Sequence, residues 1–128
     1  SSVLSLEQEI AKIRGLTENK NPWGAWEIAR QAQESYSNDN DLLKLSVKLN
    51  EEVSSYVHVL KKAEKLEKEK RSGMSLTWYL KAKDIYPQST YANDGIKRIL
   101  DHLLPSTGQK AISTSEIKNK SAQPLNFD

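Results

Sequence analysis

The chain has 128 residues, which is the size of a single domain with one modest hydrophobic core. It contains no cysteine, so disulfide scaffolds, thiolate metal sites and cysteine nucleophiles are excluded. The 19 basic and 17 acidic residues leave a formal charge of +2, which is too balanced to indicate a nucleic-acid partner. No apolar run approaches the roughly 18 residues that a membrane-spanning helix needs, so no transmembrane segment is predicted.

Apolar residues recur at three- and four-residue steps along most of the chain, which predicts an all-α fold. The first helix is predicted to begin near Ser5, because Ser5 and Gln8 have the spacing of a capping box, and to end at Gly15 or shortly before it. A second helix is predicted to begin at Asn21–Pro22, since asparagine caps a helix and proline fits its first turn. Its apolar stripe consists of Ala25, Trp26, Ala29, Ala32 and Tyr36.

A long central helix is predicted over about residues 42–70, with a break near Ser54–Ser55 as the alternative. One apolar stripe continues through this range without an interrupting glycine or proline, and about 29 residues at 1.5 Å each give a length of roughly 43 Å. The turn after this helix is expected at Ser72–Gly73. The stripe consists of Leu42, Leu45, Leu49, Val53, Tyr56, Leu60 and Ala63.

Two shorter helices are predicted to follow. One runs from about Ser75 to Tyr86 and is ended by Pro87, and the other is capped by Ser89 or Thr90 and ended by Pro105. The segment after Pro105 is rich in Ser, Thr, Asn and Gln. We therefore predict a helical-repeat domain over residues 1–104 and a polar C-terminal tail over residues 105–128. The apolar face of the last helix consists of Tyr91, Ala92, Ile96, Ile99, Leu100 and Leu103.

The segments that hold the second and fourth predicted helices align with an offset of fifty positions. Ala32 falls opposite Ala82, and Tyr36 falls opposite Tyr86. Such self-similarity is typical of helical repeats, in which one hairpin cannot bury its own apolar face.

The second copy has the more specific spacing of small, aromatic and helix-ending residues. Ser75, Tyr79, Ala82 and Pro87 follow one another there, and Ala63 stands twelve residues before Ser75, where two helices would pack closely. This segment resembles the tetratricopeptide repeat. The resemblance implies antiparallel helical hairpins, about five helices with a long central one, and a role in contacts with other proteins. The same run also resembles repeats of bacterial envelope proteins, which implies an envelope or extracytoplasmic location over a cytoplasmic one.

The first copy departs from that pattern. The same positions read Ala25, Ala29, Ala32 and Ser37, so both the aromatic residue and the proline are missing. The copies also lie fifty residues apart, whereas the family's period is about 34 residues. The resemblance therefore implies an irregular array of about one and a half to two units.

No catalytic, cofactor-binding or metal-binding residues are predicted. The two histidines, His58 and His102, share no metal-ligand spacing, and the five glycines are too isolated to form a phosphate-binding loop. The Asp39–Asp41 segment lacks the central glycine and the closing glutamate of a calcium loop, so it is interpreted as a turn and helix cap. We therefore expect that the protein is not an enzyme and takes no cofactor.

Residues 61–71 form the densest charged segment, with five lysines and Arg71 against three glutamates. Glu64 with Lys68, and Glu67 with Arg71, have the four-residue spacing of helix ion pairs. This spacing predicts a solvent-exposed helix end whose charges pair with one another. Contact with an anionic membrane surface or nucleic acid is the alternative, although the interleaved glutamates weaken the field for a polyanion.

Two arguments nominate partner-binding residues. In tetratricopeptide proteins the first helix of each unit lines the concave face, so the resemblance implies a groove formed by Val57, Leu60, Glu64, Glu67 and Lys68. Two tryptophans, Trp23 and Trp78, fall outside the clean apolar stripes, and exposed aromatic residues dominate interface energetics.

The pattern as a whole predicts a non-enzymatic scaffold or adaptor that binds another protein or a peptide. One alternative is a structural subunit, or a fragment of a larger repeat or coiled-coil assembly, that homo-oligomerises. The other is a basic helix that binds an anionic membrane surface or nucleic acid through Lys61–Arg71. Because the sequence does not begin with methionine and carries no signal-peptide pattern at Ser1–Val3, we expect a processed chain or an excised fragment.

Overall fold

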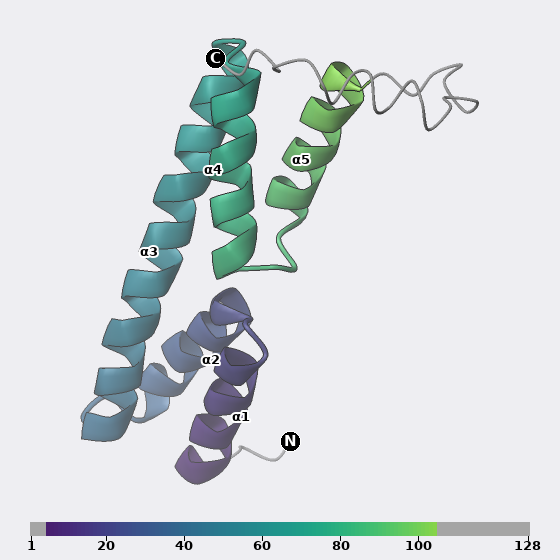
Figure 1. The fold of residues 1–128 in the computed structure, drawn as a ribbon. Coiled ribbons are helices and arrows are strands. Elements are labelled where there is room, and N and C mark those ends of the chain that lie inside the picture. The colour runs from purple at the N-terminus through teal and green to yellow at the C-terminus, as the bar shows by residue number, and fades with distance from the viewer. Residues whose placement is uncertain (1–4, 105–128) are drawn as a thin grey trace.

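The computed structural model describes residues 5–104, which form five α-helices and contain no strand. The long helix α3 runs the length of the molecule, with α1 and α2 beside its N-terminal half and α4 and α5 beside its C-terminal half (Figure 1). This arrangement confirms the predicted all-α fold with a long central helix. The predicted polar tail, residues 105–128, lies outside the described residues. The helices are α1 Leu6–Glu18, α2 Pro22–Ser35, α3 Asn40–Lys68, α4 Ser72–Ile85 and α5 Thr90–Leu103.

Short polar side chains set where the helices begin. The Ser5 hydroxyl accepts the N–H of Gln8 at 3.2 Å and the Ser5 N–H donates to the Gln8 side chain at 3.0 Å, which confirms the predicted capping box. Asn21 and Asp39 accept backbone N–H groups in the first turns of α2 and α3. Ser89 caps α5 in the same way, so the first of its two predicted caps is correct.

Two predicted helix ends are wrong. Helix α1 continues through Gly15 to Glu18, because one glycine inside a helix costs only about 1 kcal/mol and the residues beyond it still pack. Ser72 and Gly73 do not form a turn but begin α4, and Gly73 is buried. The chain turns just before them, where Lys70 adopts a φ of 65°. Glycine is the residue that usually adopts this left-handed conformation, so a lysine gives no sequence signal for the turn.

The fifty-residue repeat is present in the backbone. Helix α4 begins and ends fifty residues after α2, as Pro22–Ser35 and Ser72–Ile85 show. The turns before them also match, since Lys20 and Lys70 have φ values of 56° and 65°. In each turn the next residue donates its N–H to a carbonyl five residues back, Leu16 at 2.8 Å in one turn and Leu66 at 3.0 Å in the other. The backbone therefore follows two successive units of the same design.

Helix α3 belongs to both units. Its N-terminal half is the third helix of unit 1, which also comprises α1 and α2. Its C-terminal half is the first helix of unit 2, which also comprises α4 and α5. Each unit has its own apolar core. The unit 1 core consists of Ile13, Ala25, Ala29, Ala32, Leu42 and Leu49, and the unit 2 core of Tyr56, Val59, Leu60, Ala63, Tyr79, Ala82, Ala92 and Ile99.

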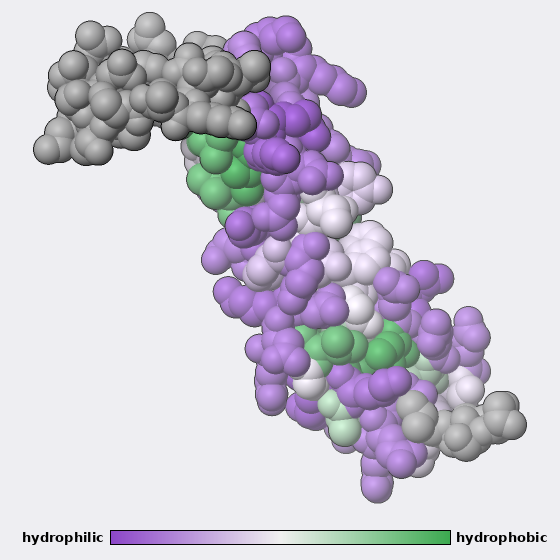
Figure 2. All heavy atoms as spheres, turned by 90° about the vertical axis from the view of Figure 1, so that its right-hand side faces the viewer, coloured by the Kyte–Doolittle hydropathy of each residue, from purple (hydrophilic) through white to green (hydrophobic). Residues whose placement is uncertain are grey.

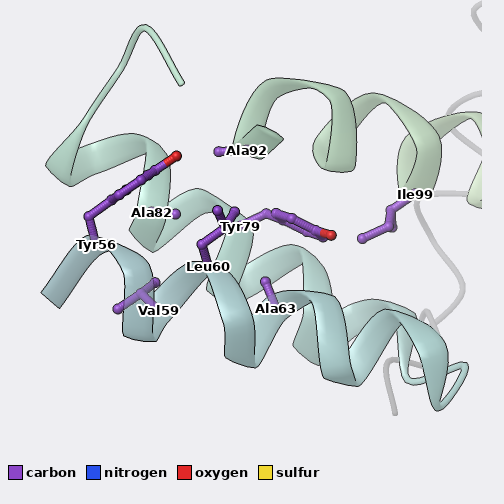
Figure 3. Close-up of a cluster of buried hydrophobic side chains, with 8 residues drawn as sticks. All are labelled: Tyr56, Val59, Leu60, Ala63, Tyr79, Ala82, Ala92 and Ile99. Carbon is purple, nitrogen blue, oxygen red and sulfur yellow. The ribbon is translucent and has the colours of Figure 1, made fainter. Parts of the chain in front are cut away.

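The two cores place a large and a small side chain on opposite helices. In unit 2 the ring of Tyr79 fills the space between α3 and α5 (Figure 3), and the facing position on α5 is Gly95. In unit 1 the corresponding residues are Ala29 and Leu45, so the small residue is on the second helix and the large one on the third. Because a close-packed core conserves volume rather than identity, the two arrangements support the same backbone.

Some predicted core residues are only partly buried. Tyr56 is buried as its apolar stripe predicts, at 4% exposure, whereas Trp26 and Tyr36 are half-buried at the edge of the unit 1 core. Tyr91 was predicted on the apolar face of the last helix, but 66% of it is exposed. It lies in the first turn of α5, ahead of the residues that pack on α4.

One buried polar group in unit 1 lacks a hydrogen bond. Within residues 5–104, the Ser46 hydroxyl on α3 is buried and has no partner. A Ser46→Ala variant is therefore expected to raise the free energy of unfolding by about 1 kcal/mol, since a buried, unsatisfied hydroxyl is removed. Urea unfolding measures this change. The exposed Ser54→Ala is the matched control, with an expected gain of only a few tenths of a kcal/mol from helix propensity; equal gains for both variants would contradict the buried-hydroxyl explanation.

Candidate functional site

A pocket of about 380 Å³ lies where the two units meet. Three parts of the fold form it: the first turn of α2, the middle of α3, and the turn between α4 and α5. Because α3 passes through the junction without a break, it supplies the floor, and the other two segments approach it from unit 1 and unit 2. The lining residues are Trp23, Tyr56, Val57, Leu60, Tyr86, Gln88, Ser89, Thr90 and Tyr91.

Aromatic rings make up much of this pocket. Trp23 and Tyr56 have ring centroids 6.1 Å apart at an interplanar angle of 75°, and Tyr56 and Tyr86 are 5.4 Å apart at 80°. These edge-to-face contacts hold the rings in fixed orientations across the unit boundary. Figure 2 shows two green hydrophobic areas on one face of the molecule and, between them, a pale band of intermediate hydropathy at the height of the junction.

The pocket lining includes one buried polar pair and no charged side chain. The hydroxyls of Tyr56 and Ser89 lie 2.5 Å apart in a buried hydrogen bond, and the Ser89 oxygen also accepts the N–H of Ala92. Burial raises the pKa of Tyr56, so its phenol stays neutral at physiological pH. An uncharged lining rich in aromatic rings suits an apolar side chain better than an ion.

The structure brings three of the predicted binding residues together in this pocket. Trp23 enters from α2, and Val57 and Leu60 lie on the facing side of α3. Glu64 is half-buried one helical turn further along α3, and Lys68 is exposed near its end. The pocket thus gathers the apolar members of the predicted set, while the charged members extend away from it along α3.

Glu67 is engaged within the protein. Its carboxylate accepts the Tyr79 hydroxyl at 2.6 Å and two N–H groups of Arg98 at 2.9 and 3.0 Å. The hydrogen bond from Arg98, supported by the one from Tyr79, holds the pKa of Glu67 below its usual range despite partial burial. Burial and the neighbouring Glu67 carboxylate raise the pKa of Tyr79. These bonds tie α3, α4 and α5 together, so Glu67 serves the fold of unit 2.

Trp78 lies apart from the pocket. It is half-buried on α4, where the ammonium groups of Lys62 and Lys81 lie 4.8 and 4.2 Å from the centroid of its ring. Such contacts are cation–π interactions. Of the two predicted tryptophan anchors, only Trp23 therefore belongs to the junction.

Six of the nine lining residues were not predicted as binding residues, Tyr86 and Tyr91 among them. Tyr86 is the C-cap of α4 and Tyr91 is the second residue of α5, so both flank the short Pro87–Ser89 connection. Two tyrosines on either side of a proline-containing turn can be recognised in the sequence as candidate binding residues. Their meeting with Trp23 could not be predicted, because it depends on how unit 1 packs on unit 2.

Comparisons of the chain with protein-family models, with curated proteins and with solved structures found no match. Within residues 5–104 there is no group of three or more His, Cys, Asp or Glu side chains placed to hold a metal ion. In the part of the chain that the structure describes, no helix combines the length and the apolar composition needed to cross a membrane.

Proposed function

We propose that this chain is a non-enzymatic protein–protein interaction scaffold, and that it binds a peptide segment of its partner in the pocket at the unit junction. The observation that carries the proposal is the set of aromatic rings fixed around a pocket of about 380 Å³. Aromatic residues in concave sites are the usual anchors of protein interfaces, because they bury a large area at low entropic cost. The exposed ring of Tyr91 is available to such a partner.

We further propose that the hairpins are tetratricopeptide-like. The close contact between α3 and α4 supports this assignment, since Ala63 and Ser75 are both fully buried and the Ser75 hydroxyl donates to the Ala63 carbonyl at 2.7 Å. Tyr79 and Ala82 are also fully buried at the positions that the repeat pattern gives to an aromatic residue and a small one.

The pocket size and rim favour a peptide as the ligand. A volume of about 380 Å³ is near the lower end of the roughly 300–1,000 Å³ range of ligand sites, so it accommodates one or two side chains. Gln88 and Thr90 are exposed at the rim and offer hydrogen-bonding groups to a peptide backbone. We therefore expect an anchor residue that is aromatic or aliphatic.

A random-peptide library selected on the wild-type protein tests this function. The dissociation constant of each selected peptide is then measured for the wild type, for Tyr91→Ala and for Leu80→Ala. Tyr91→Ala is expected to weaken binding about tenfold or more, which corresponds to about 1.4 kcal/mol. Leu80 is the control, because it is 49% exposed on α4 and does not line the junction pocket.

Two results would contradict the proposal. The first is a library that yields no peptide with a measurable affinity. The second is a set of peptides that bind the wild type and Tyr91→Ala equally well, because the anchor would then lie elsewhere. Circular dichroism of the variant establishes that the helices are retained.

The alternative of a homo-oligomeric subunit is favoured by apolar residues near the end of α5. Leu100 and Leu104 are 40% and 55% exposed, and Leu103 beside them is partly buried. The peptide titrations are therefore run at protein concentrations at which sedimentation velocity gives a monomer. A chain that stays dimeric on dilution into the nanomolar range would favour the subunit alternative.

A further inference from the structure

A second hollow, of about 370 Å³, lies on the outer side of α3 and is predominantly basic. Lys65 follows Leu60 by five residues, which places it about 140° further round the helix at 3.6 residues per turn. The hollow therefore faces away from the junction pocket and is a separate surface. Its lining residues are His58, Lys61, Lys62, Lys65, Leu66, Glu69 and Arg71.

The basic side chains of this hollow have no acidic partner among residues 5–104. The ion pairs within that range are Lys20 with Asp84 and Arg98 with Glu67. The predicted pairing of Glu67 with Arg71 is wrong, because Arg98 takes the Glu67 carboxylate, and Arg71 instead contacts the sulfur of Met74.

The predicted pair of Glu64 with Lys68 does not form either. The expected self-paired helix end is thus a surface whose lysines and Arg71 form no ion pair with an acidic side chain of residues 5–104. Glu69 is the one acidic residue in the lining, against three lysines and Arg71.

Two further contacts extend the positive surface onto α4. The ammonium groups of Lys62 and Lys81 lie within 9 Å of each other, since 4.8 and 4.2 Å separate them from the centroid of the same Trp78 ring. Like charges held this close repel, and an anion between or beside them relieves the repulsion. The Trp78 ring thus holds part of the basic surface in place.

We propose that this basic hollow docks an extended, acidic segment of a partner protein, in which aspartate or glutamate alternates with uncharged residues. The spacing of the lysines is the reason for choosing an extended peptide. Lys61 and Lys65 are one helical turn apart, or about 6 Å along the axis. Alternate side chains of an extended peptide recur about every 6.6 Å on one side, so successive carboxylates match successive lysines.

The same surface suits a nucleic acid less well. Single-stranded nucleic acids bind through bases that stack on aromatic faces, and the Trp78 ring is already in contact with two ammonium groups. Glu69 within the hollow repels a continuous row of phosphates. A peptide with uncharged residues between its carboxylates can pass Glu69 without that repulsion.

Fluorescence anisotropy tests the proposal with a fluorescein-labelled peptide of six Glu-Gly repeats, titrated at 50 mM and 150 mM salt. The wild type is expected to bind, with weaker binding at the higher salt concentration. Lys61→Glu/Lys65→Glu is expected to raise the dissociation constant more than tenfold. The matched control is Lys44→Glu/Lys48→Glu, which makes the same charge change at exposed positions of the same helix and should leave the constant within about twofold. Lys48 lies thirteen residues before Lys61, about 20 Å along the helix, which exceeds two Debye lengths at 150 mM salt.

Three results would overturn the proposal. The first is that the peptide does not bind at 50 mM salt, and the second is that the two double variants lose affinity equally. The third is that a twelve-residue oligothymidylate binds the wild type more tightly than the peptide does, and that Lys61→Glu/Lys65→Glu no longer binds this oligonucleotide. The last result would assign the hollow to nucleic acid. Tyr91→Ala should bind the acidic peptide as the wild type does, so failure of this proposal and failure of the junction pocket are distinguishable.

Discussion

Replacing Gly95 with alanine is expected to lower the free energy of unfolding by about 2 kcal/mol. A Cβ at this position would lie 2.4 Å from two carbons of the Tyr79 ring, which is well inside van der Waals contact. Tyr79 is fully buried and cannot move away without breaking its hydrogen bond to Glu67. Overpacking of this kind costs about 1–3 kcal/mol or more, and exceeds the roughly 1 kcal/mol that alanine gains over glycine in a helix. Urea unfolding followed by circular dichroism measures the difference.

Gly15→Ala is the matched control for Gly95→Ala. Gly15 also lies inside a helix, but no atom comes within 4 Å of a Cβ placed there. This variant is expected to gain up to about 1 kcal/mol, because only the helix propensity changes. Opposite signs for the two variants identify the Tyr79 ring as the cause. A Gly95→Ala variant as stable as the wild type would show that α5 does not need the close approach.

A double variant isolates the contact itself. Tyr79→Leu removes the ring and loses stability of its own, because it empties part of the core and leaves Glu67 with Arg98 as its remaining partner. Once the ring is gone, adding Gly95→Ala is expected to cost less than it does in the wild-type background. The difference is the coupling free energy of the pair, for which contacting residues give about 0.5–3 kcal/mol.

Local features of the fold could be predicted from the sequence, and pairwise features could not. The caps at Ser5 and Asn21 depend on residues three positions away, so their spacing is visible in the chain. The fit of Tyr79 against Gly95 depends on the distance between α4 and α5. In unit 1 the equivalent positions hold Ala29 and Leu45, so the small residue is on the second helix and the large one on the third. The two copies therefore differ in sequence at positions that have the same place in the backbone.

The candidate site shows the same division. The repeat resemblance predicted that Val57 and Leu60 face a partner, and both line the junction pocket. Glu67 was predicted on the same face, but Arg98, thirty-one residues later, forms a bidentate pair with it. The four-residue spacing rule applies within one helix, so it cannot predict that an arginine from another helix pairs with Glu67. Arg71, which this competition leaves without Glu67, lines the basic hollow on the outer side of α3 together with Lys61 and Lys65.

Proline at position 55 is expected to cost at least about 3 kcal/mol and to uncouple the two units. Ser55 is exposed in the middle of α3, so its side chain makes little contribution to the core. Proline there removes one backbone hydrogen bond and clashes with the carbonyl of Glu51. Tyr56 is the next residue, and the contacts of its ring with Trp23 and Tyr86 join the units at the junction pocket.

Asn40→Pro is the control, because it places the same residue in the same helix at the first helical position. Proline is tolerated at that position, and the preceding Asp39, with φ −74° and ψ 123°, is already in the extended conformation that a following proline requires. Its stability should change by less than about 0.5 kcal/mol. A substitution that is harmful at position 55 and harmless at position 40 would locate the effect in the shared helix.

Unfolding of Ser55→Pro should therefore no longer follow one transition. The tryptophans divide between the units, with Trp23 and Trp26 in α2 and Trp78 in α4, so a Trp78→Phe version reports on unit 1 by fluorescence while circular dichroism at 222 nm reports on both. In the wild-type background the two signals should coincide, as they do for a cooperative domain. With Ser55→Pro they should separate, because α3 is the covalent and helical link through which one core supports the other. A single coincident transition with a loss below about 1 kcal/mol would mean that the units are held together by their surface contacts, with the continuity of α3 contributing little.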